Sequence, residues 1–102
     1  MEFIEVPSFT SHVLRHLGDD EYVRLQVYLT YRPDAGNLIP GSRGLPKLRW
    51  AAKGHGKRGG VRVIYYWHVT PELITLLDLY PKNEKDNLSK AEIRLLNLLL
   101  ED

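Results

Sequence analysis

Two consecutive apolar segments constrain the fold of this chain more than any other feature of its sequence. Residues 61–69 are rich in β-branched and aromatic side chains, and residues 73–80 form a second apolar run. Only a short Thr70-Pro71 connection separates them. We therefore expect an antiparallel hairpin, in which Pro71 is tolerated because it lies in the turn and not within a paired strand.

The N-terminal third has the pattern of a short strand followed by two helices. Residues 3–6 predict the strand, and Ser8 fits the N-cap of a first helix that Gly18 closes. A second helix begins with the acidic residues 19–21, because acidic side chains favour the positive end of a helix dipole. Pro33 is expected to stop this helix.

The middle of the chain alternates between loop and strand. Residues 33–44 contain two prolines and three glycines, which predict a loop. In residues 45–50 polar and apolar side chains alternate, so we expect a strand with Lys47 and Arg49 on one face. The glycines and cations of residues 53–60 indicate a flexible basic loop before the hairpin.

The C-terminal segment predicts a helix with a well-marked start. Ser89 and Glu92 fit a capping box. The helix is apolar on two sides, formed by Ile93, Leu96 and Leu100 on one side and by Leu95, Leu98 and Leu99 on the other. Such a helix is either buried on both sides within its own domain or covers a second surface with a partner, and we favour the first.

In chain order these elements give β-α-α-β-β-β-α. We expect a single domain over residues 1–102, of the α+β class, with an antiparallel sheet and helices packed on one face. A content of 43 % apolar and 26 % charged residues is ordinary for a globular domain.

Several protein classes are excluded by what the sequence lacks. The absence of cysteine excludes disulfides, thiolate metal sites and cysteine nucleophiles. The longest apolar run is far shorter than a membrane helix requires, and the acidic N-terminal residues do not resemble a secretion signal. We expect a cytoplasmic protein with no membrane partner.

The formal net charge of +1 conceals a strong asymmetry. Residues 1–34 carry three basic and six acidic side chains, and residues 72–102 carry four basic and seven acidic ones, a net of −3 each. Residues 35–71 contain no acid and seven cations, which are Arg43, Lys47, Arg49, Lys53, Lys57, Arg58 and Arg62. This distribution is expected for a phosphate-binding surface, and the alternative is a solvated basic loop.

The expected strands bring several of these cations together. Arg62 begins the strand after the one that carries Lys47 and Arg49, and the hairpin returns so that Tyr80 lies near Arg62. Lys82 then leaves the sheet at the same end. We expect these five residues on one concave surface that is open to solvent or to an anion, because burying unpaired charges is costly.

Such a cluster is suited to RNA chemistry. Arg and Lys hold a phosphate and stabilise the charge of its transition state, and neighbouring cations lower the pKa of a Lys or Tyr that transfers protons. Metal-free cleavage requires only activation of the 2′-OH, binding of the phosphate and protonation of the leaving 5′-oxygen. A non-catalytic RNA-binding surface uses the same residues, so both alternatives remain open.

Other candidate residues are less specific. His12 and His16 have the i, i+4 spacing of a zinc site, but no third ligand is recognisable, and we expect no metal or other cofactor. His55 lies in the basic loop and could contact RNA. Asp78 could pair with a nearby Arg or Lys. Glu84 could transfer protons or position Arg62 or Lys82 through an ion pair.

Three motifs together resemble the HigB branch of the RelE toxin superfamily. They are Gly-Leu-Pro-Lys-Leu-Arg at residues 44–49, Gly-Lys-Arg-Gly-Gly-Val-Arg-Val-Ile-Tyr-Tyr at residues 56–66, and Tyr-Pro-Lys-Asn-Glu at residues 80–84. The similarity is strongest over residues 38–90. Some members carry a tyrosine near the start of the final helix, where this chain has Asn-Leu-Ser at residues 87–89.

The resemblance implies a toxin of a type II toxin–antitoxin system. Members of this superfamily are compact α+β proteins that cleave mRNA in the ribosomal A site without a metal, as ribosome-dependent endoribonucleases (mRNA interferases). It also implies a cognate antitoxin, of the helix-turn-helix type, that blocks the toxin.

Carried over by position, the resemblance assigns roles to individual residues. Arg62 would contact the scissile phosphate, and Lys47 and Lys82 would be candidates for proton transfer. Arg49 would contact a phosphate or ribosomal RNA. The same motifs add Tyr80 and Glu84 to the catalytic candidates, and the remaining cations expected to bind RNA or the ribosome are Arg43, Lys53, Lys57 and Arg58.

Overall fold

The computed structural model of the chain describes residues 1–51, 60–85 and 87–101 and confirms the α+β class. The elements within these ranges are β1 (Glu2–Glu5), α1 (Pro7–His16), α2 (Asp19–Tyr31), β2 (Asn37–Leu38), β3 (Pro46–Trp50), β4 (Val61–His68), β5 (Leu73–Pro81) and α3 (Lys90–Leu100). The expected order lacked one strand, because the two residues of β2 lie in a segment whose prolines and glycines predicted only loop.

The strands form one mixed sheet in the order β1-β5-β4-β3-β2. The expected hairpin of β4 and β5 is confirmed as an antiparallel pair at the centre of the sheet. The expectation of a wholly antiparallel sheet is wrong, because β1 lies parallel to β5. The chain leaves β1 along the outer edge of β5, where Val6 donates its N–H to the carbonyl of Leu76 (3.1 Å) and Ser8 donates its Oγ–H to the carbonyl of Leu77 (2.7 Å).

These contacts also change the start of the first helix. The N-cap of α1 is Val6, and Ser8, expected at that position, lies within the first turn. Its hydroxyl binds the neighbouring strand instead of the helix end. Pro7 suits the first turn of the helix. N–H groups in that turn have no intrahelical acceptor, so the N–H that proline lacks is not missed.

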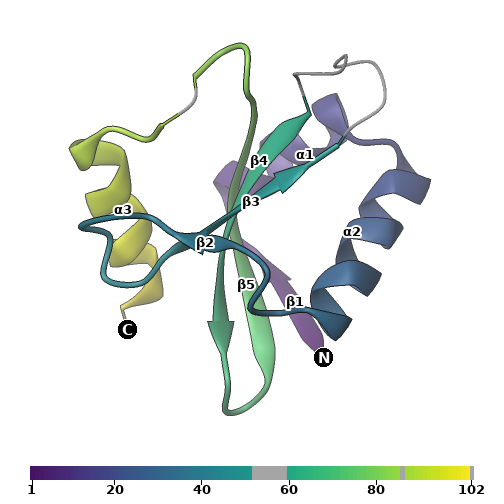
Figure 1. Cartoon of the computed structure of the whole chain (residues 1–102), viewed down its shortest axis with the longest axis horizontal. Helices are drawn as coiled ribbons and strands as arrows, with labels where there is room; N and C mark the ends of the chain where they lie inside the picture. The colour runs from purple at the N-terminus through teal and green to yellow at the C-terminus, as the bar shows by residue number, and fades with distance from the viewer. Residues whose placement is uncertain (52–59, 86, 102) are drawn as a thin grey trace.

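Helices cover both faces of the sheet, as Figure 1 shows, and the expectation that all helices share one face is wrong. The helices α1 and α2 pack against one face, with a core that includes Phe9, Val13, Leu25, Leu29, Val61, Val63, Tyr65, Ile74, Leu76 and Leu79. The opposite face carries a second core under α3, formed by Leu45, Ile64, Leu77, Tyr80 and Leu96. The reason is that β4 and β5 are apolar on both faces, so each face needs a covering layer.

The C-terminal helix begins as its sequence predicts but buries only one of its apolar sides. Ser89 Oγ accepts the N–H of Glu92 (3.1 Å), and Glu92 Oε1 accepts the N–H of Ser89 (2.9 Å), which together form the expected capping box. Leu96 is buried against the sheet, whereas Leu95, Leu98 and Leu99 are 62 %, 54 % and 50 % exposed. Burial of both sides, which the sequence favoured, is therefore wrong. Within the described part of the chain, no helix is long and apolar enough to cross a bilayer.

The residue that precedes β4 is fixed by close backbone contact. Gly60 has a φ of +69°, a left-handed conformation that glycine adopts without strain. A Cβ atom at this position would lie 2.4 Å from the carbonyl oxygen of Trp50, in the neighbouring strand. The carbonyl of Gly60 also accepts the N–H of Lys82 (3.3 Å), so Gly60 helps to align the three strands.

We predict that Gly60→Ala lowers the free energy of unfolding by more than about 2 kcal/mol, because it combines a left-handed alanine with a backbone clash. Gly41→Ala is the matched control, since Gly41 has a φ of +72° but nothing within 4 Å of the added Cβ. It should cost only about 1 kcal/mol. Denaturant unfolding of both variants measures the difference, and equal losses would show that the clash with Trp50 contributes nothing.

Candidate functional site

A row of three polar side chains crosses the centre of the sheet on the face that also packs against α3. Arg49 of β3 is the register partner of Arg62 of β4, and Arg62 is in turn the partner of Tyr80 of β5. Register partners project from the same face, and adjacent strands are about 4.8 Å apart, so the row spans about 10 Å. The sequence-predicted convergence of these residues is therefore present in the register.

Lys47 extends this group along β3. It lies two residues before Arg49, and therefore on the same face of the strand. Its Nζ donates a hydrogen bond to Oδ1 of Asn87 (3.1 Å), in the segment before α3. The amide oxygen of Asn87 thus holds a lysine of the site in place.

The five predicted residues differ in their access to solvent. Arg49 and Lys82 are exposed and Lys47 is half-buried, but Arg62 is only 3 % exposed and Tyr80 is 2 % exposed. The expectation that the whole face is open is thus wrong for the two residues at its centre. Arg62 lies on β4 between β3 and β5, and Tyr80 lies on β5 as its register partner.

The pairing of β5 with β4 continues one residue beyond the two strands. The N–H of Lys82 donates to the carbonyl of Gly60 (3.3 Å), which keeps Lys82 beside the strand that carries Arg62. The N–H of Glu84 closes a turn on the carbonyl of Pro81 (3.1 Å), and the Glu84 side chain is exposed. Within the described residues, the side chains of Lys82 and Glu84 form no ion pair, so the predicted pairing of Glu84 with Arg62 or Lys82 is absent there.

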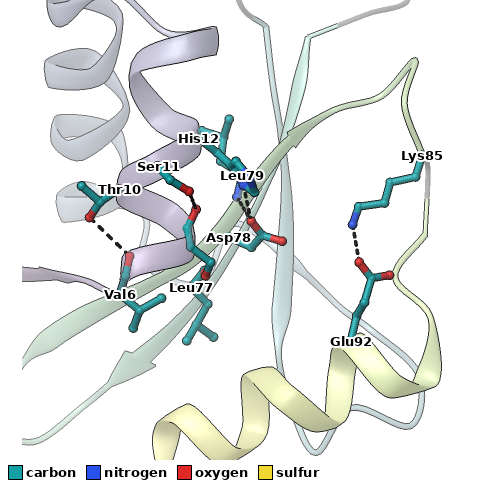
Figure 2. A network of polar contacts seen from close by, with 10 residues as sticks. Val6, Thr10, Ser11, His12, Leu77, Asp78, Leu79, Lys85 and Glu92 are labelled. Atoms are coloured by element: carbon teal, nitrogen blue, oxygen red, sulfur yellow. Dashed lines mark hydrogen bonds and ion pairs between the residues drawn. The ribbon is translucent and has the colours of Figure 1, made fainter.

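Lys85 links the aromatic ring of the site to the C-terminal helix. Its Nζ lies 4.9 Å from the centroid of the Tyr80 ring, in cation–π geometry, and also forms an ion pair with Glu92 of α3. Figure 2 shows this contact between the loop and the first turn of the helix. The hydrogen bond from Lys85, followed by that from the Ser89 N–H, lowers the pKa of the Glu92 carboxyl below its usual value.

Sequence reasoning assigned no firm role to Asp78, and the structure gives it a partner other than the expected Arg or Lys. His12 Nδ1 lies 2.9 Å from Asp78 Oδ1, and Figure 2 shows the two side chains meeting between α1 and β5. The N–H of Leu79 also donates to Asp78 Oδ1 (2.9 Å). No local sequence pattern relates residues that are 66 positions apart, so only the tertiary structure could reveal this pair.

The other predicted residues lie apart from the row or outside the described part of the chain. Arg43 is exposed in the loop between β2 and β3. Lys53, His55, Lys57 and Arg58 lie outside the described residues. Over residues 1–51, 60–85 and 87–101, no group of three or more His, Asp or Glu side chains is arranged to hold a metal ion.

The site thus combines a buried arginine with exposed cations around it. Guanidinium and ammonium groups bind oxyanions through charge-assisted hydrogen bonds, which are about twice as strong as neutral ones. A guanidinium in a partly dehydrated position interacts more strongly with an anion than one in bulk water. The arrangement can therefore bind a phosphate, and Lys47 and Tyr80 lie on the same face of the sheet as Arg62. No protein-family model matches the sequence.

We predict that Glu92→Gln weakens the attachment of the site loop to α3 in a pH-dependent way. Glutamine retains the capping hydrogen bonds but removes the charge that pairs with Lys85. Because the pKa of Glu92 is lower in the folded state, its stabilisation is present above the usual value of 4.5 and is lost as the pH falls through the folded pKa. The variant should be less stable than the wild type at pH 7, by under about 1 kcal/mol for a partly exposed pair.

The measurement is thermal unfolding of wild type and variant between pH 3 and pH 8 (a range of about five units around the unfolded pKa). The two curves should converge in acid. Glu2→Gln serves as the control, because Glu2 is exposed and forms no ion pair within the described residues. A Glu92→Gln deficit that is constant across this range would contradict a role for the charge.

Proposed function

We propose that this protein is the toxin of a type II toxin–antitoxin system and acts as a ribosome-dependent endoribonuclease on mRNA. The proposal combines the resemblance of residues 38–90 to the HigB branch of the RelE superfamily with the arrangement of the cations on the sheet. The reaction class is metal-free cleavage by activation of the 2′-OH in the ribosomal A site.

The observation that carries the proposal is the register of the three central strands. It joins the three sequence motifs in one place, because Arg49 comes from the first motif, Arg62 from the second and Tyr80 from the third. A surface that only attracts polyanions needs exposed cations, and their arrangement is not important. Here a buried arginine lies beside a tyrosine, with exposed cations around it. This arrangement favours a specific phosphate-binding site over general attraction of polyanions.

Within this proposal, the degree of burial divides the residues by role. Arg62, at the floor of the site, stabilises the charge that develops on the scissile phosphate, while Arg49 and Lys82 bind phosphates from the rim. Lys47, held by Asn87, and Lys82 are the candidates for proton transfer. Tyr80 and Glu84 are further candidates, and of these only Glu84 is exposed.

The proposed partners are mRNA on the ribosome and a cognate antitoxin of the helix-turn-helix type. The antitoxin follows from the family resemblance alone. The alternative function is a non-catalytic module that binds RNA or the ribosome with the same cations.

We predict that Arg49→Ala and Lys82→Ala each reduce message cleavage about 100-fold or more, because each removes one cation from a charged transition state. Both side chains are exposed, so these variants should fold normally. The measurement is the rate at which new 5′ ends appear in a defined message on purified ribosomes, mapped by primer extension. Arg62→Met, which keeps an aliphatic side chain in the buried position, should abolish cleavage.

Arg24→Ala is the control for loss of a positive charge, since Arg24 is exposed on α2, which covers the opposite face of the sheet. It should cleave like the wild type. Growth arrest by the wild type without new message ends would favour the binding module. Full cleavage by a folded Arg62→Met variant would refute the role assigned to Arg62.

A further inference from the structure

A groove lies between the loop that joins β2 to β3 and one side of α3. Figure 1 shows this loop approaching α3 on the side of the sheet away from α1 and α2. The groove has a volume of about 530 Å³. Its walls include Arg43 from the loop, and Lys90, Arg94 and Asn97 from α3.

The loop wall of the groove is fixed by hydrogen bonds to buried groups. Asn97 Nδ2 donates to the carbonyl of Ser42 (2.9 Å), which ties the loop to the helix. Ser42 is fully buried, and its hydroxyl donates to the carbonyl of Ile39 (2.6 Å) and accepts the N–H of Leu45 (3.0 Å). The groove is therefore preformed in the folded protein.

Arg43 occupies an unfavourable backbone conformation within this loop. Its φ of +60° lies in the left-handed region, which an arginine enters at a cost of about 1–2 kcal/mol. A conformation of this kind persists where the surrounding contacts determine it, and such positions are enriched at functional sites. Here the hydrogen bonds of Ser42, the residue before Arg43, fix the backbone of the loop. They thereby place Arg43 in the wall of the groove.

The charge of the groove is predominantly positive. Arg43, Lys90 and Arg94 are all exposed, and among the described residues Glu101 is the one acid that lines the groove. Across the described ranges, none of the three cations has an ion-pair partner. Lys90 and Arg94 are one helical turn apart, so their side chains project from the same face, with Cβ atoms about 5–6 Å apart.

Two short segments of the chain connect the groove to the row of cations on the sheet. Asn87, which binds Lys47 of the site, precedes Lys90 by only three residues, and the loop that carries Arg43 leads directly into β3. An RNA backbone that binds at Arg49 and Lys47 therefore has a second set of cations nearby in the fold, along α3.

We propose that this groove binds the phosphate backbone of RNA as an extension of the candidate site. The identification of the polyanion as RNA rests on the proposed function. The phosphates belong either to the message on one side of the cleaved bond or to ribosomal RNA next to the A site. Arg43, Lys90 and Arg94 are the residues that bind them.

The test replaces all three cations, in the variant Arg43→Gln/Lys90→Gln/Arg94→Gln. Its matched control is Arg15→Gln/Arg24→Gln/Arg32→Gln, which removes the same charge from exposed positions on α1, α2 and the residue that ends α2. One arm measures fluorescence anisotropy with a labelled single-stranded RNA oligonucleotide over a range of salt concentrations. A second arm measures co-sedimentation with purified ribosomes.

We expect the groove variant to bind at least about tenfold more weakly than the control in one of the two arms. The arm affected distinguishes the message from ribosomal RNA. If the oligonucleotide is the ligand, the slope of log K against log salt should become shallower by about 2, because each contact to single-stranded RNA contributes about 0.7. Unfolding temperatures of both variants should match that of the wild type, which excludes a folding defect.

Equal binding by the groove variant and the control in both arms would overturn the proposal. Message cleavage by the wild type in that case would leave the proposed function intact. A wild type that binds RNA through the groove but cleaves nothing would support this inference and refute the nuclease. Failure of the wild type to bind in either arm, or equally strong displacement by poly-L-glutamate, would overturn the groove as an RNA site.

Discussion

The pairing of β4 with β5 is the interaction on which the rest of this structure depends. It joins the two longest strands at the centre of the sheet and sets Arg62 beside Tyr80. The register shifts between Ile64 and Tyr65, so Leu77 of β5 has no partner and forms a bulge. As a result, Leu77 packs in the core under α3 and Asp78, the next residue, lines a groove beside the same helix. The bulge also brings Asp78 to His12, and the carbonyl of Leu77 to the hydroxyl of Ser8.

Local patterns predicted the elements well because their causes are local. The capping box of Ser89 and Glu92 needs only residues within one helical turn, and the hairpin follows from two apolar runs across a short connection. The direction of β1 and the face covered by α3 depend instead on contacts between distant parts of the chain. A two-sided apolar strand indicates that both faces are covered, but it does not say which helix covers which face. For the same reason the partnership of His12 with Asp78 left no signal in the sequence.

The residues of the candidate site could be predicted from the sequence, but their exposure to solvent could not. Alternation along β3 and the reach of the hairpin were enough to place Lys47, Arg49, Arg62 and Tyr80 on one face. Burial depends on what lies over that face, and the sequence does not specify it. Dehydrating several cations would be costly, and the structure limits that cost to one arginine by leaving Arg49 and Lys82 in solvent. A single dehydrated guanidinium is the stronger electrostatic partner for an anion that displaces the remaining water.

The acidic and basic residues of this chain nearly balance in number, and the layers of the fold separate some of them from one another. The acids of the first helical turn of α2 lie in the layer that covers one face of the sheet, and the row of cations lies on the other. Opposite charges on the same face would pair with the cations and neutralise them, as Glu92 does for Lys85 at the margin of the site. The sheet thus separates the acids at the start of α2 from Arg49 and Arg62, although Asp78 and Glu92 lie on the same side as that row. Exposed cations such as Arg49 can therefore attract an approaching polyanion without the self-repulsion that a high net charge would bring to the folded state.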